Sequence, residues 1–168
     1  SGSHGRLFEM NGKLRATLAT APLAVSVGEF LTFLRSQDAT AEHFMQLCKA
    51  RVVYTSDKND SPLVDHIHQA IISMPRPAGL RDEIYAARIE SEQGAGQRNL
   101  KRYQGGTMDV EYIVQMLQLM HAKQHPDILQ TGTLAALERL QQAQCLDPDD
   151  ATALSKSYIF LREIEAGL

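Results

Sequence analysis

The chain has 168 residues, of which 43% are hydrophobic and 22% are charged, and its formal net charge is −3. This length can bury the core of one domain, and the composition is ordinary for a globular protein and argues against disorder. The charge balance predicts no general attraction to nucleic acid or to an anionic membrane. No apolar run approaches the roughly 20 residues of a membrane span, and the N-terminus lacks an apolar signal core, so we expect a cytoplasmic protein.

The first 25 residues differ in character from the rest of the chain. Residues 1–5 have the composition of a cloning remnant and are excluded from fold reasoning. Residues 6–25 begin with alternating apolar and polar residues around an Asn11-Gly12 step. The alternation predicts an extended segment or a hairpin.

From Ser26 onward the apolar residues recur with helical spacing. Cap residues and prolines predict about seven helices, which begin near residues 26, 40, 61, 80, 107, 133 and 147. On the fourth, Leu80, Ile84 and Ala87 form the apolar face, and we expect a charged surface formed by Arg81, Asp82, Glu83, Arg88, Glu90 and Glu92. Residues 26–168 are therefore predicted to form a mainly all-α, up-and-down helical bundle.

The fifth predicted helix has the most distinctive start. Gly105 and Gly106 interrupt the preceding segment, and Thr107 is a predicted N-cap. Asp109 and Glu111 place negative charge in the first turn, where the helix dipole favours it.

The residues before this helix allow two interpretations. Lys101 and Arg102 beside Gly105 and Gly106 form a candidate site for an anion or a nucleotide, because free amides and cations converge at a helix start. In the other interpretation, the glycines form only a tight entry turn and the two cations are solvated.

Residues 105–115, Gly-Gly-Thr-Met-Asp-Val-Glu-Tyr-Ile-Val-Gln, resemble the signature Gly-Gly-x-x-Asp-Ile-Glu-Phe-Ile-x-Gln of glutamine synthetase adenylyltransferases. These enzymes attach AMP to glutamine synthetase and remove it. The resemblance continues at residues 22–26, 49–54, 133–137, 149–154 and 157–165, in the order of the family, and covers roughly residues 7–166. It implies a helical domain preceded, at residues 6–25, by the end of a nucleotidyltransferase sheet.

The resemblance also has consequences for chemistry. The last metal-binding aspartate of the family's sheet corresponds to Asn11, whose neutral amide is a poor ligand for Mg²⁺. The family's Gly-Ser and Asp-x-Asp pairs have no counterpart here. We therefore assign no catalytic residue and predict that the chain alone is inactive, although Mg²⁺ and ATP are implied for the parent family.

The resemblance implies two alternative functions. The first is the helical, non-catalytic part of an adenylyltransferase-like protein, with glutamine synthetase and a PII-type signalling protein as partners. Arg51-Val52-Val53-Tyr54 slightly favours the half of the enzyme that adds AMP. The alternative is a free-standing interaction module, descended from that enzyme, that has lost catalysis. An independent enzyme has no residues to support it.

Other polar residues predict structural roles. Asp109 and Glu111 are about 200° apart on a helix, so an internal partner, such as an arginine on a neighbouring helix, is favoured over a shared metal. His121 and His125 have a chelate spacing, but Pro126 disfavours helical geometry at the second, and we assign no metal site. His66 and His68 point apart on a helix. Two cysteines lie within helical apolar patterns, and we expect reduced, buried thiols at Cys48 and Cys145.

Overall fold

The computed structural model describes residues 25–54, 61–76, 78–93, 99 and 101–167. These residues form α-helices and one short 3-10 helix, with no strand among them: α1 (Val27–Leu34), α2 (Ala41–Cys48), α3 (Ser61–Ser73), α4 (Leu80–Gln93), α5 (Thr107–His121), η1 (Pro126–Ile128), α6 (Thr133–Gln142) and α7 (Pro148–Gly167). The predicted all-α bundle is confirmed. The expected remnants at residues 1–5 and 6–25, including Asn11, lie outside the described residues except for Val25.

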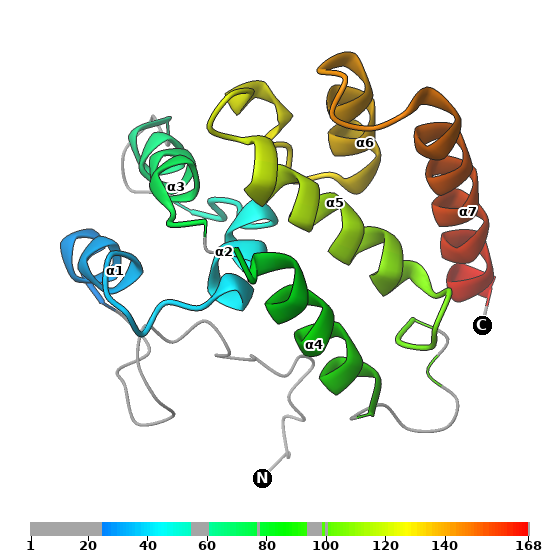
Figure 1. Ribbon diagram of the computed structural model, residues 1–168, viewed down its shortest axis with the longest axis horizontal. Helices are drawn as coiled ribbons and strands as arrows, with labels where there is room; N and C mark the ends of the chain where they lie inside the picture. The colour runs from blue at the N-terminus through cyan, green and yellow to red at the C-terminus, as the bar shows by residue number, and fades with distance from the viewer. Residues whose placement is uncertain (1–24, 55–60, 77, 94–98, 100, 168) are drawn as a thin grey trace, which may run out of the picture.

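Helix α5 is the central element of the bundle. It packs against α2, α4, α6, α7 and η1, and Figure 1 shows it between α4 on one side and α7 on the other. None of the described helices combines the length and the apolar character that a membrane span requires.

Two clusters of buried side chains lie along α5. The first connects α1–α4 with the end of α5 and contains Leu34, Ala41, Phe44, Met45, Leu47, Cys48, Ile71, Met74, Leu80, Ile84, Leu119, Ala122 and Leu129. The second connects the beginning of α5 with η1 and α6 through Val110, Val114, Ile128, Ala136, Leu137 and Leu140, and α7 packs against it through the partly buried Leu154 and Tyr158. Because both clusters include α5, the position of this helix determines how the two parts of the core meet.

Several helix starts agree with the sequence. The amide of Glu29 donates to Ser26 Oγ at 3.2 Å, while the carboxylate of Glu29 accepts from the Ser26 amide at 2.8 Å, which completes a capping box. At the start of α7, Asp147 accepts from the amide of Asp149 at 2.8 Å. The predicted caps at Ser26 and Asp147 are confirmed.

The predicted cap at Thr107 is wrong. Thr107 is the first residue of α5 and Gly106 is the N-cap. The buried Thr107 hydroxyl donates instead to the carboxylate of Glu165 on α7, at 2.5 Å. A partner 58 positions away in the sequence therefore replaces the local cap.

A buried amide fixes the segment that follows α5. Gln118 is almost completely buried, and its side-chain amide donates to the carbonyls of Ile128 at 2.8 Å and Gln130 at 2.9 Å. The Ile128 carbonyl also accepts from the Gln130 amide at 2.8 Å, so the Gln118 side chain adds a second donor to this carbonyl and pairs the Gln130 carbonyl. The segment is thereby attached to the middle of the bundle.

Candidate functional site at the start of the central helix

The turn before α5 has a conformation that requires glycine. Gly105 has a φ of 82°, in the left-handed region, and its amide donates to the carboxylate of Asp109 at 2.5 Å. The amide of Gly106 donates to the Tyr103 carbonyl at 2.8 Å, and the amide of Met108 donates to the Lys101 carbonyl at 3.1 Å. The chain itself therefore accepts the hydrogen bonds of these three amides.

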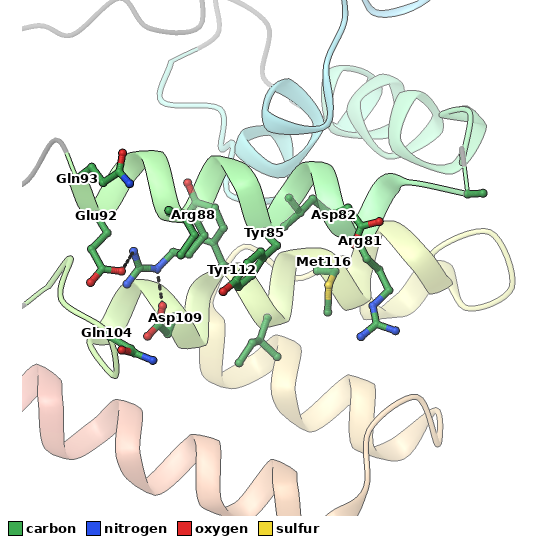
Figure 2. Close-up of a pocket in the computed structure, with 14 residues that line it drawn as sticks. Arg81, Asp82, Tyr85, Arg88, Glu92, Gln93, Gln104, Asp109, Tyr112 and Met116 are labelled. Atoms are coloured by element: carbon green, nitrogen blue, oxygen red, sulfur yellow. Dashed lines mark hydrogen bonds and ion pairs between the residues drawn. The ribbon is translucent and has the colours of Figure 1, made fainter.

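A buried guanidinium connects this turn to α4. Arg88 is only 6% exposed, and its Nε forms an ion pair with Asp109. Its Nη2 donates to the carbonyls of Arg102 at 2.9 Å and Tyr103 at 3.1 Å, and its Nη1 lies 3.5 Å from Glu92. Figure 2 shows Arg88 between Asp109 and Glu92, with dashed lines to both. These contacts compensate the loss of hydration of a buried charge.

The expectation that Arg88 belongs to a charged surface is wrong. Arg88 lies four positions after Ile84 and eight after Leu80, both buried, so it continues the inward face of α4. That spacing was the available signal, and the charge of the residue concealed it. The expectation of an arginine partner for one of the signature acids is confirmed by the Arg88–Asp109 pair.

The candidate anion residues lie together on this turn. Lys101 is exposed, Arg102 is partly exposed, and the backbone of Gly105 and Gly106 lies between them and α5. The carboxylate of Asp109 already accepts from the Gly105 amide of this turn. Anion binding at this corner stays a prediction.

Glu111 connects a different set of helices. Its carboxylate lies 3.0 Å from Lys49 Nζ on α2's C-terminal side and accepts from the Tyr158 hydroxyl of α7 at 3.1 Å. Lys49 Nζ also lies 3.3 Å from the hydroxyl of Thr133, the first residue of α6. Burial, together with the nearby Glu111 carboxylate, raises the pKa of Tyr158. Asp109 and Glu111 thus contact separate partners on different sides of α5.

The histidines and cysteines show the following arrangement. Helix α5 ends at His121, and His125 has φ −130° and ψ 74°, outside helical geometry. Among the described residues, no three His, Cys, Asp or Glu side chains are grouped closely enough to hold a metal ion. Both cysteines are free thiols; Cys48 is buried as expected, but Cys145 is only partly buried.

A groove of about 1060 Å³ opens beside Arg88, along α4 and α5. We call it the α4–α5 groove. Figure 2 shows its side chains, with Glu92, Gln93 and Gln104 at one end and Arg81 and Asp82 at the other. The sequence did not predict it, because the charged residues of α4 that line it, Arg81, Asp82, Arg88 and Glu92, were assigned to a solvated surface.

Fold and site together define a helical domain whose central helix begins at a Gly-Gly turn and carries two acids in structural contacts. The family described as GlnD PII-uridylyltransferase matches residues 82–168, just over half of the chain, and the chain therefore belongs to this family.

Particular relatives agree with the resemblance of residues 105–115. A protein of Xanthobacter autotrophicus named bifunctional glutamine synthetase adenylyltransferase/adenylyl-removing enzyme is 34% identical over 157 residues, which are 91% of this chain. Proteins of the same name from Rhodopseudomonas palustris and Bradyrhizobium diazoefficiens are 32% and 30% identical over 155 residues, 90% of this chain. In each case the chain spans only 16% of the relative's length.

Proposed function

We propose that this chain is the helical, non-catalytic part of a glutamine synthetase adenylyltransferase-like protein. In this role it supports the addition and removal of AMP on glutamine synthetase by carrying and orienting a catalytic domain. The names of the relatives support the substrate, and the residues of the family signature support a structural role.

The main support for this proposal is that the two acids of the family signature, Asp109 and Glu111, form contacts between helices. Asp109 pairs with Arg88 of α4 and accepts from the Gly105 amide, while Glu111 contacts Lys49 and Tyr158. Both carboxylates are thus engaged in contacts between helices. Side chains used in this way fix the geometry of a bundle, which is what a carrier of a catalytic domain requires.

In this role the chain contributes no catalytic group of its own, and its partners are other proteins or domains. ATP and Mg²⁺ belong to the catalytic domain, and this chain alone transfers no AMP. Glutamine synthetase is the substrate protein, and a PII-type signalling protein is a regulatory partner. Lys101, Arg102, Gly105 and Gly106 form a weak anion-binding corner that faces the nucleotide or the effector, with an affinity that falls as salt rises.

A chimeric enzyme tests the proposal. Residues 25–167 of this chain would replace the matching stretch of the Xanthobacter autotrophicus relative, and transfer of labelled AMP to glutamine synthetase would be measured. We expect the chimera to retain activity and the isolated chain to have none. Activity of the isolated chain that persists through repurification and changes with its mutations would contradict the proposal, as would an inactive chimera that is correctly folded.

The alternative is a free-standing interaction module derived from the same enzyme. Asn11, at the position of the family's metal-binding aspartate, favours it. The reading frame upstream of residue 5 distinguishes the two functions. Intact Gly-Ser and Asp-x-Asp motifs there support the carrier role, and their absence supports the module.

A further inference from the structure

The α4–α5 groove has the dimensions of a protein segment. Its volume of about 1060 Å³ is at the upper limit for drug-sized ligands, which occupy roughly 300–1,000 Å³. Its lining runs along α4 from Arg81 to Gln93, which corresponds to roughly 18 Å at a rise of 1.5 Å per residue. An occupant of this length is about three turns of a helix.

The middle of the groove is apolar and accessible to water. Ile89, Ile113 and Met116 line it and are each only partly buried, and Tyr85 beside them is 69% exposed. Figure 2 shows Tyr85 and Tyr112 between the two polar ends. A stripe of apolar side chains from another helix would remove this surface from water.

The two ends of the groove differ in charge. At one end Arg81 and Asp82 balance each other in formal charge. At the other end Arg88 faces both Asp109 and Glu92, so that one guanidinium serves two carboxylates. The Glu92 contact is long, at 3.5 Å, and its side chain is 32% exposed, which leaves this carboxylate able to accept from a second cation.

We propose that the α4–α5 groove is the docking site of an amphipathic helix of a partner protein. The helix places apolar side chains at positions i, i+4 and i+7 against Ile89, Ile113 and Met116, and it places a lysine or arginine beside Glu92. Helices pack on helices by fitting side-chain ridges into such grooves, so α4 and α5 provide the matching surface. This docking site adds a protein contact to the proposed carrier role and does not depend on it.

The probe is a pair of helix-stapled peptides of about 14 residues, since shorter free peptides are only marginally helical. One carries a leucine stripe and two lysines at one end, and the other carries glutamates in place of the lysines. The lysine peptide is titrated into the isotope-labelled chain, and the amide chemical shifts of α4 and α5 should change as it binds. The glutamate peptide should bind roughly fivefold more weakly, as expected for a partly exposed ion pair.

Two variants and a matched control sharpen the test. Tyr85→Glu should weaken the lysine peptide at least about tenfold, because it places charge in the apolar middle. Glu92→Lys should reverse the order of the two peptides. Phe160→Glu alters a residue of α7 that is 61% exposed and does not line the groove, and it should leave the affinity unchanged. Thermal unfolding of each variant verifies that it is folded.

Four results would overturn the proposal. They are the absence of binding at millimolar peptide, shifts confined to α7, equal affinities of the two peptides for the unaltered chain, and a dimer in sedimentation velocity that Tyr85→Glu dissociates. The last result would assign the groove to a second copy of the chain.

Discussion

At the scale of single residues, the charged side chains of this protein divide by burial. Arg88 is nearly inaccessible, and its guanidinium contacts two carboxylates and two carbonyls. Arg162 on α7 is exposed and lies 3.0 Å from Glu165. Removing one partner of a buried ion pair destabilises the protein much more than removing one partner of an exposed pair, because the remaining buried charge is not hydrated.

Asp109→Asn should therefore destabilise the protein strongly. The change removes the main charge partner of Arg88 while it preserves the size of the side chain. We expect a loss of about 2–3 kcal/mol in the free energy of unfolding, somewhat below the usual range for buried pairs because Asp109 is partly exposed. Urea unfolding followed by circular dichroism measures it.

Arg162→Gln provides the control for this prediction. It removes the exposed member of the pair, whereas the partly buried Glu165 still accepts from Thr107, and it should change the free energy of unfolding by less than about 1 kcal/mol. Equal effects of the two substitutions would contradict the structural role of Asp109.

The two cysteines should differ in their reaction with thiol reagents. Burial raises the pKa of Cys48 to about 12, so at pH 8 the thiol is protonated and also shielded. Burial and the nearby Asp127 raise the pKa of Cys145 as well, but this thiol is partly exposed. With a thiol reagent at pH 8, we expect slow modification of Cys145 and modification of Cys48 only after unfolding. Rapid labelling of Cys48 in the folded protein would show that the thiol is accessible.

At the scale of elements, the helix starts with local signals could be predicted, and the contacts between helices could not. Ser26 and Asp147 bond to amides two or three positions away, and such pairs are visible in the sequence. Thr107 has the same chemistry but contacts Glu165 of α7. A distant partner of this kind leaves no local pattern, which is why the predicted cap was wrong.

Arg76, which follows α3, is a second residue whose contacts with another helix could not be predicted from the sequence. Its Nε donates to the Leu119 carbonyl of α5 at 2.7 Å, and its Nη1 donates to the carbonyls of Ile72 and Met74, both at 3.1 Å. The flanking Pro75 predicts only the end of a helix. The guanidinium therefore connects the end of α3 with α5 without any signal in the sequence.

Arg76→Met should loosen α3. The substitution leaves partly buried carbonyls without donors, which costs about 1–3 kcal/mol. Burial lowers the pKa of Arg76, which indicates that its surroundings are already partly desolvated. Amide hydrogen exchange should become faster in α3, whereas Arg81→Met, at an exposed position of α4, should leave α3 unchanged. Unaltered amide exchange in both variants would show that Arg76 does not stabilise the contact between α3 and α5.

At the scale of the whole molecule, the sequence predicted the fold class and located the family signature. It predicted an arginine partner for one of the signature acids, but it did not identify Arg88 and Asp109 as the pair or predict that Glu111 contacts Lys49 and Tyr158. These partners lie on other helices, so their proximity depends on how the bundle packs. The α4–α5 groove escaped prediction for the same reason, since charge on α4 indicated only a solvated face.

Leu119→Ala tests the central position of α5. Leu119 is completely buried where α5 meets the cluster of α1–α4, and its truncation should cost about 3–5 kcal/mol in the free energy of unfolding. Leu134→Ala on α6, where the side chain is 41% exposed, is the matched control and should cost less than about 1 kcal/mol. Denaturant unfolding compares the two, and similar losses would mean that the core is not centred on α5.

The uneven packing of the helices has a consequence for local opening of the native state. Helix α1 packs chiefly on α3, and Leu34 is its one buried side chain, whereas α5 has neighbours along its length. Amides of α1 should therefore exchange through openings that cost much less than global unfolding. Amides in the middle of α5 should exchange only when the whole bundle unfolds. The protein would then lose its order from α1 inward, and α5 would be the last helix to open.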